Sequence, residues 1–343
     1  MYATRLGKLG NVWWLAGLLS LFGAGWPGTA FAGNIIVDTE YVLKNKDKPG
    51  VILLDARAER DYKKGVIHGA SVIGAKGAAV ELRDMDARIL PAAKLEKILG
   101  EAGIAQSNEI IVYGDKGDNG PYVAFWVLDH LGADKAKVYH GGIDDWTTAK
   151  NPITNEVKKL PAATFTAKVQ ADRLATTEYV QKNLKNKDVQ FIDSRTRKEN
   201  SGDDIRALRG GYIPAVNHVN IPHEEGWKDP DTLKKLADKQ VENRHGAALK
   251  DPAELKALYK NLDPNKEVVA YCQTGTRSTQ TYAVLRDMGF KKVRNYDDSW
   301  IVWGSNLDLP TANTSYFDFV KVNAAMKRVD DLEKKVEALI AKK

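Results

Sequence analysis

The stretch that decides the fold reads VILLDAR over residues 51–57, and it recurs as VQFIDSR over residues 189–195. The same spacing aligns TEYV at residues 39–42 with TEYV at residues 177–180. Identities that recur in one register over so short a window indicate an internal duplication. The chain of 343 residues therefore contains two homologous halves, each about as long as a small domain.

Each half is predicted to be an α/β domain. The apolar runs above are typical of buried strands, and a second pair of strands is predicted from EIIVY at residues 109–113 and EVVAY at residues 267–271. Helical patterns follow over residues 123–131 and 279–288, and each ends before a glycine. Short apolar strands that alternate with helices predict a mainly parallel sheet, flanked by helices on both faces.

The remaining segments set the domain boundaries. A polar stretch that contains Pro161 separates the halves, and a charged segment after the second half has no counterpart in the first. We predict five segments: a signal peptide over residues 1–32, a first domain over 33–154, a linker over 155–176, a second domain over 177–310 and a helical extension over 311–343.

The C-terminal extension has a pattern close to a heptad repeat. Apolar residues recur at alternating spacings of three and four with charged residues between them: Val322, Ala325, Val329, Leu332, Val336 and Leu339. The pattern predicts an amphipathic helix. This helix either packs on its own chain or forms a short coiled coil that makes a homodimer through residues 322–339.

The N-terminal segment is typical of an export signal. Arg5 and Lys8 precede an apolar run over residues 12–22, and Ala30 and Ala32 have the spacing of a signal-peptidase site. The run is shorter than the roughly 20 residues that a spanning helix requires, so a retained membrane anchor is the weaker interpretation. We expect cleavage after Ala32, a periplasmic protein, and no stable membrane insertion after cleavage.

Charge and composition exclude several classes of function. The formal net charge is +6, from 51 basic and 45 acidic residues. The basic residues are spread along the chain, so no nucleic-acid partner is expected. One cysteine and six scattered histidines offer no metal-ligand spacing and no hydrolase signature, and we expect no metal and no other cofactor. The single cysteine, Cys272, has no partner for a disulfide within the chain, so it must be either buried or used.

Cys272 stands where ligands bind in open α/β sheets. It follows the strand of residues 267–271, and a helix is predicted after the loop QTGTRS of residues 273–278. The N–H groups of a tight loop, the helix N-terminus and Arg277 would together favour a thiolate. Gly275 supplies the backbone freedom that such a loop requires. An inert buried cysteine is the alternative.

Three kinds of motif occur in order along the chain. They are LDAR at residues 54–57 with IDSR at 192–195, GVIHGA at 65–70 with GYIPA at 211–215, and C-x-x-G-x-R at 272–277. With these motifs the sequence resembles the two-domain rhodaneses, a family of sulfurtransferases, over essentially all of the chain after residue 32. The second glycine motif departs from the family pattern at Ala215.

The resemblance implies two tandem rhodanese-like domains, of which only the second is catalytic. The first has GDKG at residues 114–117 in place of the active loop, and Gly114 or Asp115 aligns with Cys272. Neither glycine nor a carboxylate can take up sulfur. The first domain is therefore expected to be structural and to form a wall of the cleft.

The resemblance also implies a double displacement. Cys272 would take sulfur from a small anionic donor such as thiosulfate and pass it as a persulfide to cyanide or a thiol. Arg277 is expected to orient the donor, and Arg209 to approach its oxyanion. The other residues expected at the substrate act mainly through the loop backbone: Gln273, Thr274, Gly275, Thr276 and Ser278.

Other functions share parts of this pattern. A 3-mercaptopyruvate or polysulfide sulfurtransferase stays open, although loops of mercaptopyruvate enzymes usually lack an arginine at the sixth position, where Arg277 stands. Cysteine phosphatases resemble the loop but have five residues between cysteine and arginine, whereas residues 273–276 make four. A non-catalytic binding module is disfavoured because the loop around Cys272 is intact.

Overall fold

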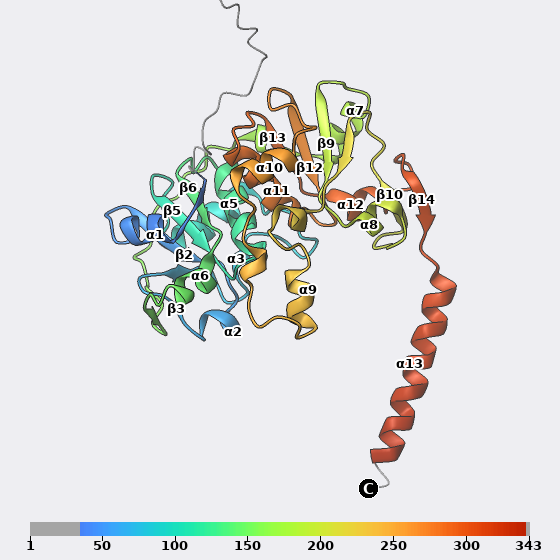
Figure 1. The fold of residues 1–343 in the computed structure, drawn as a ribbon, viewed down its shortest axis with the longest axis horizontal. Coiled ribbons are helices and arrows are strands. Elements are labelled where there is room, and N and C mark those ends of the chain that lie inside the picture. Colours follow the sequence, from blue (N-terminus) through green and yellow to red (C-terminus); the bar gives the residue numbers. More distant parts are fainter. Residues whose placement is uncertain (1–34, 341–343) are drawn as a thin grey trace, which may run out of the picture. The chain divides into compact units, whose positions relative to one another are not determined.

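The computed structural model describes residues 35–340 and contains two parallel five-stranded sheets (Figure 1). The first sheet has the order β1-β6-β5-β2-β4 and the second the order β8-β13-β12-β9-β11. The strands of the first are β1 (Ile36–Val37), β2 (Val51–Asp55), β4 (Ser71–Val72), β5 (Glu109–Tyr113) and β6 (Ala136–Tyr139). Those of the second are β8 (Leu174–Ala175), β9 (Val189–Asp193), β11 (His218–Asn220), β12 (Glu267–Tyr271) and β13 (Val293–Tyr296). Equivalent strands hold equivalent places, so the predicted duplication and the α/β fold class are confirmed.

Helices flank both sheets. The first half contains α1 (Thr39–Asn45), α2 (Glu59–Tyr62), α3 (Ala78–Glu81), α4 (Ala92–Glu101), α5 (Gly120–His130) and α6 (Gly142–Thr148). The second contains α7 (Thr177–Asn183), α8 (Arg197–Ser201), α9 (Thr232–Ala237), α10 (Pro252–Leu258), α11 (Arg277–Asp287) and α12 (Ser299–Trp303). Three short 3-10 helices complete it: η1 (Ala171–Arg173), η2 (His223–Gly226) and η3 (His245–Ala247).

The duplicated Asp-x-Arg motif closes the end of a central strand in each domain. Asp193 ends β9 opposite Tyr271 of β12, and Arg195 Nη2 lies 2.6 Å from Asp193 Oδ2. The same guanidinium nitrogen donates to Gly211 O at 2.7 Å. Arg57 repeats this arrangement in the first domain. The motif is thus a buried ion pair whose charges are satisfied by each other and by a backbone carbonyl, as burial requires.

The predicted helices are confirmed as α5 and α11, and both begin earlier than predicted. All residues of α5 and all but Arg277 and Arg286 of α11 are buried, polar ones such as Thr281 included, so the apolar pattern marks only part of each helix. Gly132 and Gly289 follow the two helices with φ of 81° and 90°, which confirms the predicted glycine ends. Pro121 occupies the first turn of α5, where a missing N–H costs nothing.

Helices α5 and α11 pack against each other and join the two domains. Asp129 of α5 accepts hydrogen bonds from Tyr282 Oη and Arg286 Nη1 of α11. The rings of Phe125 and Tyr282 lie 6.3 Å apart between the same helices. The loop of Cys272 leads directly into α11, and this helix lies at the domain interface.

Two antiparallel ribbons lie outside the main sheets. They are β3 (Val66–Ile67) with β7 (Ile153–Thr154), and β10 (Arg209–Tyr212) with β14 (Ala312–Tyr316). The sequence ANTSY of β14 is polar and has no pattern that predicts a strand. It is a strand because it pairs with β10. The predicted C-terminal helix is confirmed as α13 (Phe319–Ile340).

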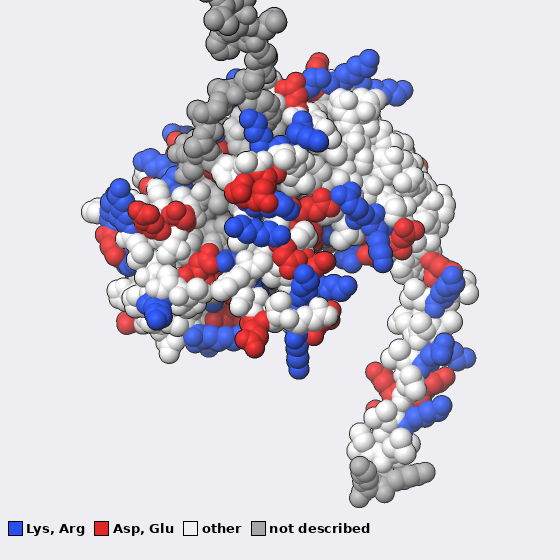
Figure 2. Space-filling view, viewed as in Figure 1, with Lys and Arg blue, Asp and Glu red and all other residues white. Residues whose placement is uncertain are grey.

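The predicted signal peptide over residues 1–32 lies outside the described residues. No helix within residues 35–340 is both long and apolar enough to span a bilayer. Basic and acidic side chains are interspersed over the face shown in Figure 2, which agrees with the spread of charge along the sequence.

Candidate active site

Cys272 occupies the turn between β12 and α11, as predicted. Its side chain is buried, with the residue 1% exposed. Gly275 curls the loop with φ of +68°, and a Cβ added there would lie 2.6 Å from Asp297 O. A side chain at this position would therefore meet both backbone strain and a backbone atom. The loop can close around the sulfur only because this residue is glycine.

The backbone N–H groups of the loop are available to an anion. Within the described chain, the N–H groups of residues 273–277 donate to no protein acceptor. The N–H of Cys272 itself is used, since it donates to Ser299 Oγ at 3.1 Å. Successive free N–H groups in a tight loop at a helix N-terminus form a site for negative charge. These N–H groups would stabilise a sulfur anion on Cys272.

A second segment, from β13 to α12, clamps the loop from outside. Trp300 N donates to Cys272 O at 3.0 Å and Ile301 N donates to Gln273 O at 2.9 Å. Asn295 Nδ2 donates to Gly275 O at 3.1 Å. These bonds occupy the carbonyl groups and leave the N–H groups of the loop free.

Ser278 is the side chain that contacts the sulfur atom. Its Oγ lies 3.6 Å from Cys272 Sγ and 2.6 Å from Asn295 Oδ1. A hydroxyl has one proton to donate, so the two acceptors compete for it. A thiolate or persulfide on Cys272 attracts that proton more strongly than a thiol does, because an ionised acceptor forms the stronger hydrogen bond.

Arg277 forms a bidentate pair with the fully buried Glu199 of α8. Its Nη1 and Nη2 atoms lie 2.8 Å and 2.7 Å from Glu199 Oε2 and Oε1. Burial raises the pKa of Glu199, but hydrogen bonds and the charge of Arg277, with bonds from Thr196, lower it to about 2. Burial disfavours the charge of Arg277, yet bonding to Glu199 and the charge of Cys272 raise the pKa of Arg277 above its ordinary value.

A pocket of about 540 Å³ lies beside Arg277 and is lined by both domains. Asn119 comes from the first domain, and its Nδ2 lies 3.3 Å from Nε2 of His223 in the second. Arg277 belongs both to this lining and to the end of the loop. The pocket therefore offers a small molecule a place next to the loop that carries Cys272.

A family model described as the rhodanese-like domain matches residues 38–149 and again residues 176–306. The chain belongs to the rhodanese family. It is 26% identical over 276 residues to the thiosulfate sulfurtransferase of Azotobacter vinelandii, covering 80% of this chain and 96% of that protein. The thiosulfate sulfurtransferase of Corynebacterium glutamicum is 28% identical over 289 residues, covering 80% of this chain and 89% of that protein.

Solved structures show the same fold. The 3-mercaptopyruvate sulfotransferase SseA from Escherichia coli superposes with a TM-score of 0.62 and 21% identity. The match covers 77% of this chain and 98% of that chain. At this identity the likeness describes the rhodanese fold and leaves the substrate open.

The structure brings most of the predicted site residues of this rhodanese together with Cys272. Gln273, Gly275 and Ser278 belong to the loop and its helix, and the hydroxyls of Thr274 and Thr276 lie 3.2 Å apart there. Gln273 Nε2 donates to Arg206 O at 2.6 Å, so its side chain is directed at the protein. The role of Arg277 in orienting a donor stays a prediction, since its two terminal nitrogens already hold Glu199.

The prediction for Arg209 requires correction. Its buried guanidinium donates to four main-chain carbonyls, those of Trp303, Gly304, Asn306 and Leu309. These bonds use four of the five N–H groups of an arginine. Arg209 therefore anchors the segment after α12 and does not reach out to an oxyanion. The resemblance to the rhodanese family implied the donor role, and sequence alone gives no sign of these distant carbonyls.

Ser299 is a site residue that was not predicted, although the duplication contains a signal for it. The spacing that aligns Trp146 with Trp303 also aligns Gly142 with Ser299. Gly142 has φ of +55° and Ser299 has φ of +50°. The first domain thus has a glycine at this left-handed position, whereas the second has a serine in a strained conformation. The hydroxyl oxygen of that serine accepts the N–H of Cys272. Strain of this kind is found at functional sites.

The corresponding loop of the first domain is filled by ion pairs. Lys116 is buried and pairs with Asp145, while its N–H donates to Asp144 Oδ2 at 2.7 Å. Asp115 lies 3.5 Å from Arg57 and 3.5 Å from Arg244, which comes from the second domain. The loop of residues 114–117 has no cysteine, and its charged side chains pair with other charged side chains.

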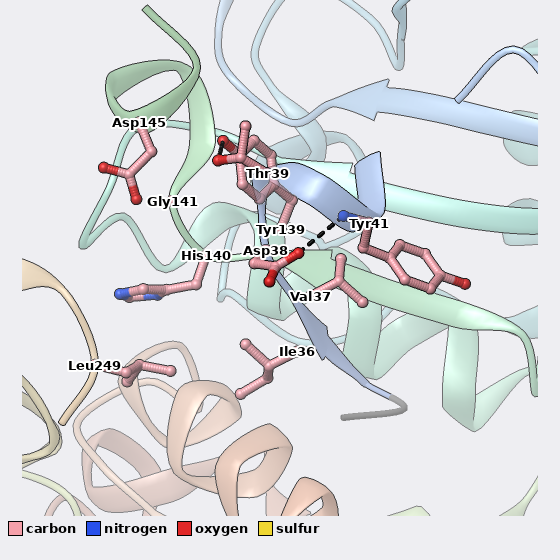
Figure 3. A pocket seen from close by; sticks show the side chains of 10 residues that line it. All are labelled: Ile36, Val37, Asp38, Thr39, Tyr41, Tyr139, His140, Gly141, Asp145 and Leu249. Atoms are coloured by element: carbon pink, nitrogen blue, oxygen red, sulfur yellow. Dashed lines mark hydrogen bonds between the residues drawn. The ribbon is translucent and has the colours of Figure 1, made fainter. Parts of the chain in front are cut away.

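A second pocket, of about 400 Å³, is lined by β1, α1 and α6 of the first domain and by Leu249 of the second (Figure 3). His140 on its wall bonds to Tyr122 Oη at 2.7 Å and to Ala247 O at 2.8 Å. Burial lowers the pKa of His140 to about 4, so the ring is neutral near pH 7. No cysteine lines this pocket, and no group of three metal-binding side chains occurs within residues 35–340.

The strain at Ser299 gives a stability prediction. Ser299→Ala loses the hydrogen bond to Cys272 and keeps the left-handed backbone, whereas Ser299→Gly loses the bond and relieves the strain. Chemical denaturation should therefore find the glycine variant about 1 kcal/mol more stable than the alanine variant. An alanine variant as stable as the glycine variant, or more so, would contradict the strain.

Proposed function

We propose that this rhodanese is a sulfurtransferase that carries sulfane sulfur from thiosulfate to cyanide or a thiol through a persulfide on Cys272. The observation that carries the proposal is the loop itself, in which the N–H groups of residues 273–277, directly after Cys272, have no acceptor within the described chain. The relatives from Azotobacter vinelandii and Corynebacterium glutamicum, both thiosulfate sulfurtransferases, support the choice of donor.

The reaction has two balanced displacements. Cys272 Sγ attacks the outer sulfur of thiosulfate, the S–S bond of the donor breaks, and its electron pair leaves with sulfite. The terminal sulfur of the new persulfide carries the negative charge, which the loop N–H groups and Ser278 Oγ can receive. Cyanide or a thiolate then attacks that terminal sulfur, and the electron pair of the breaking bond returns to Cys272 as a thiolate.

The geometry disfavours the phosphatase alternative. An arginine that binds a phosphate frequently does so with two parallel N–H donors. Here both terminal nitrogens of Arg277 are held by Glu199 at 2.8 Å or less. The loop is also one residue shorter than such enzymes require, which suits a sulfur atom.

We also propose that α13 makes a homodimer. No residue of α13 is buried, and Val329, Leu332, Val336 and Leu339 are between 52% and 66% exposed. Valine at the first and leucine at the fourth heptad position favour a parallel two-stranded coiled coil. In that register Arg328 of one copy would face Glu333 of the second copy, an attractive pair. The uncovered apolar stripe supports a partner helix over packing on the same chain.

We further propose that the protein is exported to the periplasm after cleavage following Ala32. The support is the pattern of charge, apolar run and Ala30-Phe31-Ala32 in residues 1–32.

Mass spectrometry tests the persulfide directly. After incubation with thiosulfate, the wild-type protein should gain about 32 Da, one sulfur atom, because Cys272 is the only residue that can be persulfidated. Added cyanide should remove that mass and release thiocyanate. Cys272→Ser should gain nothing and turn over no donor.

Parallel incubations with 3-mercaptopyruvate and polysulfide identify the donor. Faster loading from either one would reject thiosulfate as the preferred donor. A wild-type protein that gains no sulfur from any of the three would reject the sulfurtransferase.

Light scattering tests the dimer with two variants that each introduce one aspartate. Leu332→Asp places a charge on the apolar stripe and should leave a monomer, whereas Lys334→Asp lies at an outer heptad position and should leave the dimer intact. A wild-type protein that is monomeric at every concentration, or a dimeric Leu332→Asp variant, would reject the coiled coil.

Cell fractionation tests export. The full chain expressed in a bacterium should appear in the periplasmic fraction, and sequencing of its N-terminus should begin at Gly33. A chain that stays in the cytoplasm with residues 1–32 attached contradicts the proposal.

A further inference from the structure

An arginine of the first domain reaches the catalytic loop of the second. Arg83 follows α3, and its side chain is only 3% exposed. Its Nη1 donates to Thr276 Oγ1 at 2.7 Å, and its Nη2 donates to Thr274 O at 2.6 Å and to Asp297 Oδ1 at 2.5 Å. One guanidinium thus bonds a carbonyl, a hydroxyl and a carboxylate around the loop of Cys272.

Asp297 ties this contact to the tightest point of the loop. A Cβ on Gly275 would lie 2.8 Å from Asp297 Oδ1, so the carboxylate packs directly against the glycine. The other oxygen, Oδ2, accepts from the N–H of Ile89 at 2.6 Å. Arg83 and Ile89 are themselves paired by a β-bridge. A short segment of the first domain, residues 83–89, therefore holds Asp297 and supports the loop through it.

The bond to Thr276 also decides where hydroxyl protons point. Arginine has donors only, so Thr276 Oγ1 must accept from Arg83 and direct its own proton elsewhere. Thr274 Oγ1 lies 3.2 Å away and can accept that proton. If Thr276 donates to Thr274, the proton of Thr274 is left for a ligand of the loop. Arg83 would then direct the hydroxyl proton of Thr274 toward an anion, through the hydrogen bond from Thr276.

The charge of Arg83 has a second effect. Asp297 is a buried carboxylate, and burial raises its pKa while Arg83 and the Ile89 N–H lower it. Without Arg83 the loop would face an uncompensated buried carboxyl group. A negative charge there would repel both thiosulfate and the persulfide.

We propose that Arg83 is a positioning residue for sulfur transfer, through which the first domain completes the anion-binding loop of the second. The proposal rests on the sulfurtransferase function proposed above. The first domain, which has no catalytic cysteine, would take part in the reaction in this way. Arg83 fixes the loop, orients the hydroxyls of Thr274 and Thr276, and balances the charge of Asp297.

Arg88 provides a matched control. It belongs to the same segment and makes its own ion pair across the same interface, with Asp298 at 2.9 Å. Its side chain is 46% exposed and bonds to no residue of the loop. Arg88→Ala therefore removes one interdomain arginine–aspartate pair and no bond to the loop.

Kinetics should separate the two arginines. Arg83→Ala should lower kcat/KM for thiosulfate about 100-fold, and Arg83→Lys about 10-fold, because lysine keeps the charge but not the fork of donors. Arg88→Ala should stay within about 2-fold of the wild type. The double variant Arg83→Ala with Asp297→Asn should recover about 10-fold over Arg83→Ala, since the uncompensated carboxylate is gone.

Alkylation of Cys272 tests the same contact without sulfur transfer. Both iodoacetate and iodoacetamide react with the thiolate, so the ratio of their rates does not depend on the fraction of Cys272 that is ionised. Iodoacetate is an anion and iodoacetamide is neutral, so the ratio reports how well the loop receives an anion. This ratio should fall about 5-fold in Arg83→Ala, recover in the double variant and stay unchanged in Arg88→Ala. It can be measured even if the wild type transfers no sulfur, so the two proposals fail separately.

The inference is overturned if Arg83→Ala matches Arg88→Ala in kcat/KM and in the alkylation ratio. If Arg83→Ala does not fold, Arg83→Lys and Thr276→Val decide. Thr276→Val removes the oriented hydroxyl and should lower the alkylation ratio about 3-fold. An unchanged ratio in both variants rejects the role of Arg83.

Discussion

The structure of this site depends on one constraint: a negative charge on a sulfur atom must be held inside a folded domain. Cys272 is 1% exposed, so water cannot solvate its thiolate, and the protein must supply the donors. It supplies them as backbone N–H groups of residues 273–277, whose carbonyl neighbours are tied down by Asn295, Trp300 and Ile301. A loop this tight requires glycine at position 275, packed against Asp297.

The duplication separates chemistry from support. Both domains have the same sheet order, the same Asp-x-Arg ion pair and a loop at the same place. In the first domain that loop is filled by Lys116 and its acidic partners. Each domain also contacts the loop of the other. Arg244 of the second domain donates to Lys116 O of the first, and Arg83 of the first domain donates to the loop of Cys272. A fold that needs one nucleophile can thus use its second copy as scaffold.

The arginines show how far a motif can be trusted. The resemblance to the rhodaneses predicted both Arg209 and Arg277 at the anionic donor. In the structure Arg209 holds four carbonyls, and Arg277 holds Glu199. The arginine that does bond to the catalytic loop is Arg83, which belongs to the first domain. A guanidinium has five N–H groups, and burial forces most of them to find partners within the protein.

The sequence by itself determined the duplication, the parallel α/β fold, the strands that end at Asp55, Asp193 and Tyr271, and the loop of Cys272. These depend on local patterns, in which apolar runs, glycines and a lone cysteine carry their own signal. Only the tertiary structure decided that Ser299 accepts the N–H of Cys272 and that Arg83 completes the loop from the other domain. Those partners stand 27 and 193 residues away along the chain. What brings them together is the burial of the sheets and of the α5–α11 interface, which no local pattern records.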